Sequence, residues 1–400
     1  MVSKKNLELG LKSSVIREVF EYGKKRKAEI GEENVFDFSL GNPNIPAPKI
    51  VNDTLKKLIQ DSDPTALHGY SSGPGDIEVR KAVASYLNER YSVNESYSRI
   101  YMTCGAAASL TITLNALVEE GDEIILLAPF FPEYRVFVEH TGAKPIVVRC
   151  DWDTMQPDVT KIRDAINEHT KAIIINSPNN PTGAIYPSMV LAELSSVLSE
   201  KEVRYSHPIY VISDEPYREL SYGYPVPYTA KFIKNTISCY SFSKSLSLPG
   251  ERIGYICVCE RCEDGDNIFA AVCGAGRALG YVCAPVLFQK MIPSVLGYTS
   301  SIDEYEKNML EIKRILDECG FTYIEPQGAF YIFIKSPVSN AQEFCEAAKQ
   351  LDLLFVRGDE FGGAGYVRVA YCVSNKMIRN SEKAWIQLAK KYNLKGNGNE

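Results

Sequence analysis

A lysine, two serines and an arginine lie close together in the middle of the chain. Ser241, Ser243 and Lys244 are followed eight residues later by Arg252. A lysine at the end of a strand can act as an amine nucleophile, because partial burial lowers its pKa and lets it condense with an aldehyde. Serine hydroxyls and a guanidinium are suited to bind a phosphate. The segment therefore fits a cofactor that carries both an aldehyde and a phosphate, although a solvated Ser-rich loop has the same composition.

Two further segments at predicted strand ends could contribute to such a site. Gly105, Ala106 and Ala107 open a predicted helix, and the free N–H groups and dipole of a helix start favour a phosphate. Phe131 follows the next predicted strand, where an aromatic side chain can stack on a flat heteroaromatic ring. Small residues also serve tight helix packing, and aromatic residues are often core, so these two segments alone leave the function open.

An amide and a carboxylate follow two more predicted strands. Asn180 lies in a segment with two X-Pro pairs, which restrict the backbone and would hold its amide in one orientation. Asp214 ends the next strand, and a carboxylate buried there needs a partner such as a protonated pyridine nitrogen. Tyr217 could donate to a ring oxygen beside it. A Pro/Asn turn and an N-cap aspartate are the structural alternatives.

Short apolar strands that alternate with helical stretches must position these residues. Continuous Ile/Val/Leu strands separated by helices predict a mainly parallel seven-stranded sheet covered by helices on both faces. Ligands in such sheets bind outside the carboxyl ends of the strands, where the candidate residues gather. The predicted strands span residues 100–103, 123–127, 144–148, 172–176, 209–213, 236–240 and 253–258.

A second, smaller α+β unit is predicted from the C-terminal part of the chain. A long helix over residues 301–319 is followed by short strands, a helix and a final helix. We expect an α/β fold in which residues 46–295 form the large cofactor-binding domain. Residues 1–45 and 296–400 are expected to form the small domain.

Composition argues against several kinds of partner. The net charge of −6 over 400 residues gives no global basic field for nucleic acid or an anionic membrane. The first residues lack an apolar stretch, so we expect no signal peptide and a cytoplasmic protein. The eleven cysteines are scattered, which is typical of reduced thiols. Cys257, Cys259 and Cys262 lack a second Cys or His pair at finger spacing, so we expect no metal site.

The motifs together resemble the class I/II aminotransferases, fold-type I pyridoxal-phosphate enzymes of the aspartate aminotransferase type. The resemblance covers nearly the whole chain and implies pyridoxal 5′-phosphate as cofactor, with an amino acid and a 2-oxo acid as substrates. Its most specific parts are Asn180-Pro-Thr-Gly183, Ser213-Asp-Glu-Pro-Tyr217 and Ser241-Phe-Ser-Lys244 with Arg252. Gly365-Tyr-Val-Arg-Val-Ala370 is also similar to the family's substrate-carboxylate arginine motif, and Gln327-Gly-Ala-Phe-Tyr331 to its small-domain strand.

The resemblance implies a role for each matching residue. Lys244 would bind the cofactor's aldehyde and then serve as general base, and Asp214 would keep the pyridine nitrogen protonated. Asn180 and Tyr217 would bond the phenolic oxygen. Phe131 would stack on the ring, at a position where many relatives carry Tyr or Trp. The phosphate would be held by the backbone of Ala106 and Ala107 and by Ser241, Ser243 and Arg252.

Substrate and subunit contacts are also implied. Gly41 and Arg368 would receive the substrate α-carboxylate, Arg368 through a bidentate fork. Tyr70, five residues before Gly75, would reach the phosphate of the neighbouring subunit, which implies a homodimer with shared active sites. Arg277 lies roughly where dicarboxylate-specific relatives carry an arginine that enters the partner's site. Aspartate and glutamate with 2-oxoglutarate are then the expected substrates, with a surface arginine as the alternative.

Two other functions fit parts of the same pattern. C–S β-lyases and aminocyclopropane-carboxylate synthases share the fold, but these lyases often carry Ile-His where this chain has Pro216-Tyr217. An aminotransferase-like sensor domain of a transcription regulator would follow a winged helix, and only about 35 residues precede the first predicted strand. A transaminase (EC 2.6.1.-) is therefore the expected function.

Overall fold

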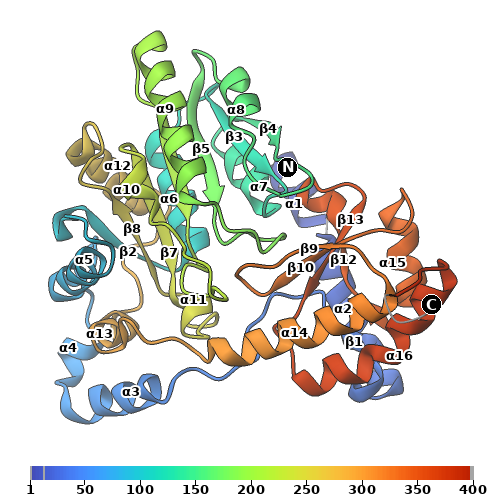
Figure 1. Cartoon of the computed structure of the whole chain (residues 1–400). Helices are drawn as coiled ribbons and strands as arrows, with labels where there is room; N and C mark the ends of the chain where they lie inside the picture. Colours follow the sequence, from blue (N-terminus) through green and yellow to red (C-terminus); the bar gives the residue numbers. More distant parts are fainter. Residues whose placement is uncertain (1, 12–13, 397–400) are drawn as a thin grey trace.

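A seven-stranded sheet forms the centre of the larger part of the molecule (Figure 1). The computed structural model describes residues 2–11 and 14–396. All neighbouring strands run parallel except β8, which is antiparallel to both of its neighbours. The predicted mainly parallel α/β sheet is confirmed. Across the sheet the order is β2 (Ile100–Thr103), β8 (Gly254–Val258), β7 (Thr236–Ser241), β6 (Tyr210–Asp214), β5 (Thr170–Asn176), β3 (Glu123–Ala128) and β4 (Lys144–Arg149).

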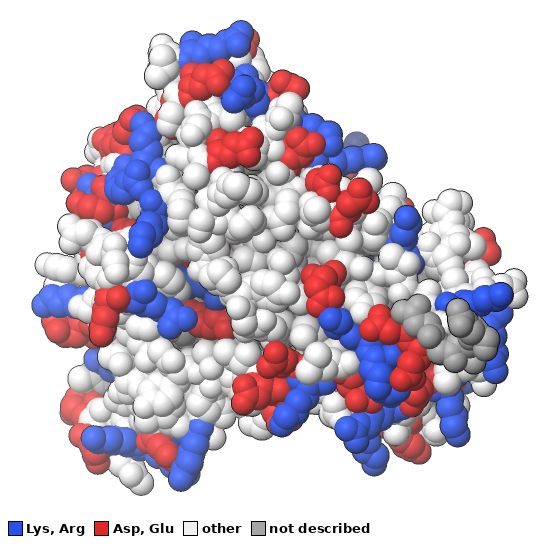
Figure 2. Space-filling model, viewed as in Figure 1, with Lys and Arg blue, Asp and Glu red and all other residues white. Residues whose placement is uncertain are grey.

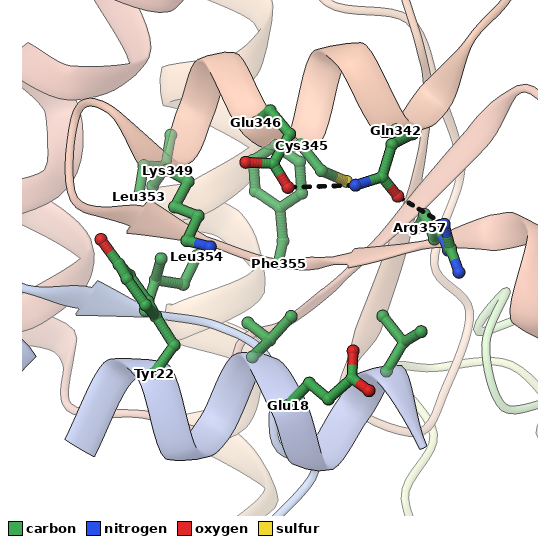
Figure 3. Close-up of a pocket in the computed structure, with 12 residues that line it drawn as sticks. Glu18, Tyr22, Gln342, Cys345, Glu346, Lys349, Leu353, Leu354, Phe355 and Arg357 are labelled. Atoms are coloured by element: carbon green, nitrogen blue, oxygen red, sulfur yellow. Dashed lines mark hydrogen bonds between the residues drawn. The ribbon is translucent and has the colours of Figure 1, made fainter. Parts of the chain in front are cut away.

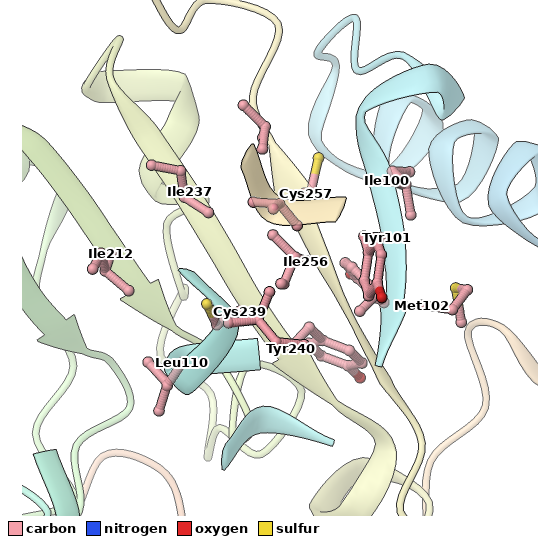
Figure 4. Close-up of a cluster of buried hydrophobic side chains, with 14 of the residues drawn as sticks. Ile100, Tyr101, Met102, Leu110, Ile212, Ile237, Cys239, Tyr240, Ile256 and Cys257 are labelled. Carbon is pink, nitrogen blue, oxygen red and sulfur yellow. The ribbon is translucent and has the colours of Figure 1, made fainter. Parts of the chain in front are cut away.

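Alternate residues of the central strands fill two cores, one on each face of the sheet. Ile124 and Leu126 belong to the core under α6 (Ala106–Leu117), part of which Figure 4 shows. Ile125 and Leu127 belong to the core on the other face. This alternation arises because successive side chains of a strand point to opposite faces. With both faces covered, only the strand ends are left for a site.

Helices and loops connect these strands. Several begin with a side-chain cap, for example α5, where Asp76 Oδ1 accepts from the N–H of Glu78 at 2.9 Å. Such caps satisfy N–H groups that have no partner within the helix. The remaining helices of this part are α3 (Lys49–Asp61), α4 (Pro64–His68), α5 (Ile77–Tyr91), η2 (Tyr97–Arg99), α7 (Glu133–His140), α8 (Val159–Ala165), α9 (Ser188–Tyr205), α10 (Thr229–Phe232), α11 (Phe242–Ser245), α12 (Gly265–Ala278) and α13 (Val286–Val295).

A second, antiparallel sheet lies beside the first and carries its own core. Its order is β12-β13-β10-β9, and the buried Trp385 packs into the core next to it. β1 pairs in parallel with β11, so the N-terminal segment joins the C-terminal part of the chain. The division at residues 46 and 295 stays a prediction. The elements are α1 (Lys4–Leu11), α2 (Val15–Ile30), η1 (Glu32–Asn34), β1 (Phe36–Asp37), α14 (Ile302–Cys319), β9 (Tyr323–Ile324), β10 (Tyr331–Lys335), α15 (Ala341–Lys349), β11 (Leu353–Leu354), β12 (Val356–Arg357), η3 (Gly358–Phe361), β13 (Tyr366–Ala370) and α16 (Asn375–Lys391).

Charged side chains of both signs are mixed on the surface. On the face shown in Figure 2, Lys and Arg alternate with Asp and Glu around a central region that carries few charges. Among the described residues, no helix has both the length and the apolar character needed to cross a bilayer.

Candidate active site

A cavity of about 260 Å³ lies at the carboxyl ends of β6 and β7, against β10 and β13 of the smaller sheet. Twelve of the fourteen predicted site residues line it, although they come from segments spread over most of the chain. They are Gly41, Ala106, Ala107, Phe131, Asn180, Asp214, Tyr217, Ser241, Ser243, Lys244, Arg252 and Arg368.

Lys244 projects into this cavity from α11, directly after β7. Its Nζ donates to the backbone oxygen of Gly41 at 2.7 Å and lies 5.5 Å from the centre of the Phe330 ring. Burial lowers the pKa of Lys244 to about 8, and the nearby Arg368 and Arg252 act in the same direction. A neutral amine is thus available near neutral pH, which nucleophilic or general-base chemistry requires.

Asp214 ends β6 and is buried at the floor of the cavity. The Tyr134 hydroxyl donates to Asp214 Oδ2, whereas Oδ1 is buried without a hydrogen-bond partner among the described residues. Burial raises the pKa of Asp214 to about 7, while the Tyr134 hydrogen bond opposes that rise. A buried oxygen without a partner is costly, so the carboxylate is set to receive a donor from a ligand.

Arg368 on β13 is a buried cation without a carboxylate partner among the described residues. Its Nη2 donates to Ser39 O at 2.6 Å and its Nη1 to Asn180 Oδ1 at 3.1 Å. The guanidinium lies 4.7 and 4.8 Å from the ring centres of Tyr331 and Phe361. Burial lowers the pKa of Arg368. Its Nε has no partner either, so the fork can still bind an anion.

Hydroxyl and guanidinium groups gather at another part of the cavity. Ser241 Oγ and Ser243 Oγ lie 2.7 Å apart, and Arg252 Nη1 donates to Ser243 Oγ at 3.4 Å. A Cβ added to Gly105 would lie 2.8 Å from Arg252 Nη2. Gly105 has a φ of +89°, a backbone conformation that favours glycine, and its lack of a side chain lets the backbone before α6 approach this guanidinium. The N-terminus of α6, the two serines and Arg252 together form an anion-binding arrangement.

Tyr217 and Gly41 are held by a residue that sequence reasoning did not assign to the site. Tyr331 Oη lies 2.9 Å from Tyr217 Oη. A Cβ on Gly41 would lie 2.0 Å from the same Tyr331 oxygen, so no larger residue fits there without displacing Tyr331. Sequence reasoning did quote Tyr331, but only as part of a strand motif.

Three of the other cavity residues, which sequence reasoning did not assign to the site, show why it missed them. Tyr134 stands one helical turn after Phe131, with the two rings edge to face at 5.6 Å, and this spacing was the only signal for it. Asn176 Oδ1 accepts from the backbone N–H of Asn180 at 2.8 Å and fixes that loop. Ile16 of α2 reaches the cavity from the N-terminal segment, for which the sequence offered no signal.

Tyr70 and Arg277 do not line the cavity. The Tyr70 side chain is 89% exposed, and Arg277 is exposed near the end of α12. The loop after Tyr70 lies near the segment that follows Arg277, because Gln289 Nε2 donates both to Ser71 Oγ at 3.2 Å and to Ala284 O at 2.7 Å. If these residues contribute to a site, they do so from this outer surface.

A second cavity, of about 180 Å³, lies between α2 and α15 (Figure 3). Lys349 Nζ lies 4.1 Å from the centre of the Tyr22 ring at one side of it. None of the predicted site residues lines this cavity. The amine, carboxylate and guanidinium needed for the predicted chemistry therefore meet in the first cavity.

Comparisons with known proteins agree with this geometry. The sequence pattern of the family "Aminotransferase class I and II" matches residues 33–382. An aspartate aminotransferase from Pyrococcus horikoshii is 29% identical over 381 residues, 92% of each chain. A probable N-acetyl-LL-diaminopimelate aminotransferase from Bacillus subtilis is 28% identical over 87% of each chain. The crystal structure of an aminotransferase from Eubacterium rectale is 49% identical, covers 98% of this chain and 99% of its own, and superimposes with a TM-score of 0.96.

Proposed function

Because the chain belongs to the aminotransferase class I and II family, which uses pyridoxal 5′-phosphate, we propose that it moves an amino group from an L-amino acid to a 2-oxo acid. The observation that carries this proposal is the shared cavity of Lys244, Asp214 and Arg368. An amine of lowered pKa meets a carboxylate oxygen and a guanidinium there, and among residues 2–11 and 14–396 the oxygen has no donor and the guanidinium no carboxylate.

The cavity residues fit the cofactor. The free Asp214 Oδ1 suits a protonated ring nitrogen, and the close approach of Gly105 to Arg252 leaves backbone N–H groups beside a cation for a phosphate. When bound, the cofactor supplies an electron sink for the bonds at the substrate's Cα. We propose that Lys244 attaches it, Asp214, Asn180, Tyr217 and Phe131 hold its ring, and Ala106, Ala107, Ser241, Ser243 and Arg252 hold its phosphate.

The chain's own residues then orient the substrate and move one proton. Arg368 binds the α-carboxylate through its fork, next to the Gly41 backbone. The free Lys244 amine takes the Cα proton as general base, a positioned transfer worth about 10²–10⁴-fold. Tyr134 holds Asp214 in place through its hydrogen bond. Tyr217 is fixed by the Tyr331 hydroxyl.

We further propose a homodimer in which Tyr70 completes the partner's site. Tyr70, Leu279 and Val282 are exposed by 89%, 38% and 62%, and a Cβ on Gly73 would lie 3.9 Å from Val282 O. Exposed apolar residues that adjoin in this way are typical of a protein interface. The expected cytoplasmic location also stays a prediction.

Dicarboxylic amino acids are the finer proposal for the substrate. Arg277 would reach the partner's cavity from the same surface as Tyr70 and bind the distal carboxylate of aspartate or glutamate, with 2-oxoglutarate as acceptor. The relative from Pyrococcus horikoshii is an aspartate aminotransferase, whereas the relative from Bacillus subtilis is described as a probable diaminopimelate-type enzyme.

A panel of amino donors offered with 2-oxoglutarate tests these proposals. We expect glutamate to appear in proportion to the 2-oxo acid formed, and aspartate to lose at least about 10²-fold in kcat/KM in R277A if a buried charge pair is lost. Phenylalanine and alanine should lose much less in that variant. Ammonia released without any acceptor would indicate a β-lyase. Equal loss for all donors, or preference of the wild-type enzyme for neutral donors, would contradict the dicarboxylate proposal alone.

A further inference from the structure

A buried carboxylate and two buried thiols meet at the edge of the large sheet opposite the active cavity. Glu95 comes from the connection between α5 and β2, Cys257 from β8 and Cys259 from just beyond it. One side-chain atom of each lies within 4.8 Å of the other two. Cys257 pairs with Ile100, the first residue of β2 (Figure 4). The cluster therefore lies where the parallel strands begin, whereas the active cavity lies where they end.

The Glu95 carboxylate has no cationic partner within the described residues, although the residue is only 6% exposed. It accepts from Glu260 N at 2.9 Å, from the Tyr228 hydroxyl at 3.4 Å and from Cys257 Sγ at 3.8 Å. Buried carboxylates are as a rule paired with a cation or bound to a metal, because desolvation of the charge is costly. The two cysteines beside Glu95 can supply thiolate sulfur, which is a common metal ligand.

We propose that Glu95, Cys257 and Cys259 bind a zinc ion. Thiolate sulfur and carboxylate oxygen are zinc ligands, and in a tetrahedral site such atoms lie about 3.5–3.8 Å apart. The 3.8 Å between Cys257 Sγ and Glu95 Oε2 has this spacing. On binding, each thiol releases its proton to the buffer and its sulfur donates an electron pair to Zn²⁺, so no group changes oxidation state.

The surroundings of the cluster supply an entry path and hold Glu95 in place. A surface hollow of about 520 Å³ is lined by Glu95 and Glu260, among others. In the proposed site a water molecule that enters from this hollow is the fourth ligand. Asn88 donates to Glu95 O at 3.0 Å and accepts from Glu95 N at 2.6 Å. The main chain that presents the carboxylate is thereby fixed, as in metal sites whose ligands are oriented by a second layer of hydrogen bonds.

The spacing of the cysteines alone led to the expectation of no metal. That expectation lacked Glu95, which lies 162 residues before Cys257. Cys262, the third cysteine of the run, donates to Thr236 O at 3.2 Å and is not part of the cluster. It is a buried thiol a few residues away, and so it offers a matched control.

Metal analysis of the full-length holoenzyme, purified with reductant and without chelator, tests the proposal. We expect about one zinc per chain in the wild type and in C262S, and none in the double variant C257S/C259S. Cobalt added to the chelator-treated wild-type chain should give a thiolate-to-cobalt charge-transfer band, which E95Q weakens and the double variant lacks. Since the cluster is remote from the active cavity, transamination by folded enzyme at room temperature should be unchanged by zinc removal.

A wild-type chain that takes up neither zinc nor cobalt would overturn the proposal and leave a hydrogen-bonded network with a protonated Glu95. If the double variant C257S/C259S retains zinc, the ion is bound elsewhere. Loss of zinc in C262S together with its retention in the double variant would also contradict the proposed site. If the double variant does not fold, thiol labelling of the wild-type chain replaces it. Because the Cys257 and Cys259 thiols are buried, the reaction is followed in urea that lets the chain open transiently. Added zinc should slow the reaction of Cys257 and Cys259 with a thiol reagent, but not that of Cys345, and equal rates with and without zinc would contradict the site.

Discussion

Two arginines of this protein are almost equally buried but have opposite surroundings. Arg218 and Arg368 are 3% and 2% exposed. Arg218 pairs with Glu215 at 2.8 Å and Glu219 at 3.3 Å, and its Nη2 donates to Tyr255 Oη at 2.9 Å. Within the described part of the chain, the hydrogen-bond acceptors of Arg368 are a backbone oxygen and an amide oxygen.

The difference distinguishes an arginine whose charge is balanced within the protein from one whose charge is left to bind a ligand. Burial opposes the charge of both groups, but Tyr255, Tyr91 and the two glutamates raise the pKa of Arg218, whereas the pKa of Arg368 is lowered. A buried cation with two carboxylates is already neutralised and needs no further anion. A buried cation without a carboxylate partner carries an uncompensated desolvation cost, and binding of an anion lowers that cost. Two lysines differ in position and not in pairing, since each donates to a backbone oxygen. Lys201 donates to Ile166 O at 3.3 Å and does not line the cavity, whereas Lys244 does.

The largest expected effect is the loss of turnover in K244A. We expect a decrease of at least about 10⁴-fold, because both the covalent attachment and the proton transfer require this amine. K201A removes a buried lysine that does not line the cavity and should leave kcat within about threefold of the wild type, since no reacting group is lost. Single-turnover amino transfer measured for both variants checks this. Comparable losses in the two variants would show that the contrast between the lysines is wrong.

We expect R218A to be less stable than the wild type, while the folded variant keeps its catalytic activity. Removing this guanidinium leaves Glu215 and Glu219 buried and unpaired, which should lower the free energy of unfolding by about 3–5 kcal/mol. Urea unfolding of the holoenzyme measures the loss, and R218A/E215Q should recover part of it. If R218A has the same free energy of unfolding as the wild type, then Arg218 does not balance the two buried glutamates.

The opposite result is expected for R368A. The variant leaves no carboxylate unpaired, so its stability should change little, whereas kcat/KM should fall by about 10²–10³-fold for every amino acid, because the α-carboxylate is common to all. R368K keeps the charge but not the fork and should recover only part of the activity. Steady-state kinetics with two unlike donors checks this, and a loss confined to one donor would argue against α-carboxylate binding.

The smallest effect concerns Asp214 and pH. Its pKa in the folded chain is raised to about 7, so the folded state binds the proton more tightly than the unfolded state, and this contribution to stability disappears as pH rises from about 4 to 7. D214N removes the titration. In cofactor-free protein its stability relative to the wild type should increase by about 2–3 kcal/mol from pH 5 to pH 8. A pH-independent difference in urea unfolding would contradict the raised pKa.

Much of the fold and of the cavity followed from local sequence patterns. Continuous apolar strands predicted the sheet, and Asp214 and Lys244 were found because each stands directly at a strand end. Glycine and proline marked the loops that carry Gly41 and Asn180. These signals are short-range, because strand ends, helix starts and turns are each determined within a few residues.

The rest depends on contacts between distant segments. Whether Tyr134 reaches Asp214, or Arg218 reaches Tyr255, depends on how helices pack against strands. The hydrophobic periodicity of the sequence does not predict that packing. Ile16 reaches the cavity only because α2 folds back over the smaller sheet. Glu95 meets Cys257 because β8 is antiparallel, which its apolar pattern did not reveal.

Lys244 and Arg252 belong to one connection, the segment between β7 and β8. The segment is closed at its base by the hydrogen bond from Phe242 N to Ile253 O at 3.1 Å. A ligand that binds both the Lys244 amine and the Arg252 guanidinium restrains this segment at two points. Its amide protons then exchange with solvent only when both attachments open together, so these residues form one cooperative unit of opening. The slowest-exchanging amides of the loaded enzyme thus extend beyond its helices and strands into a loop.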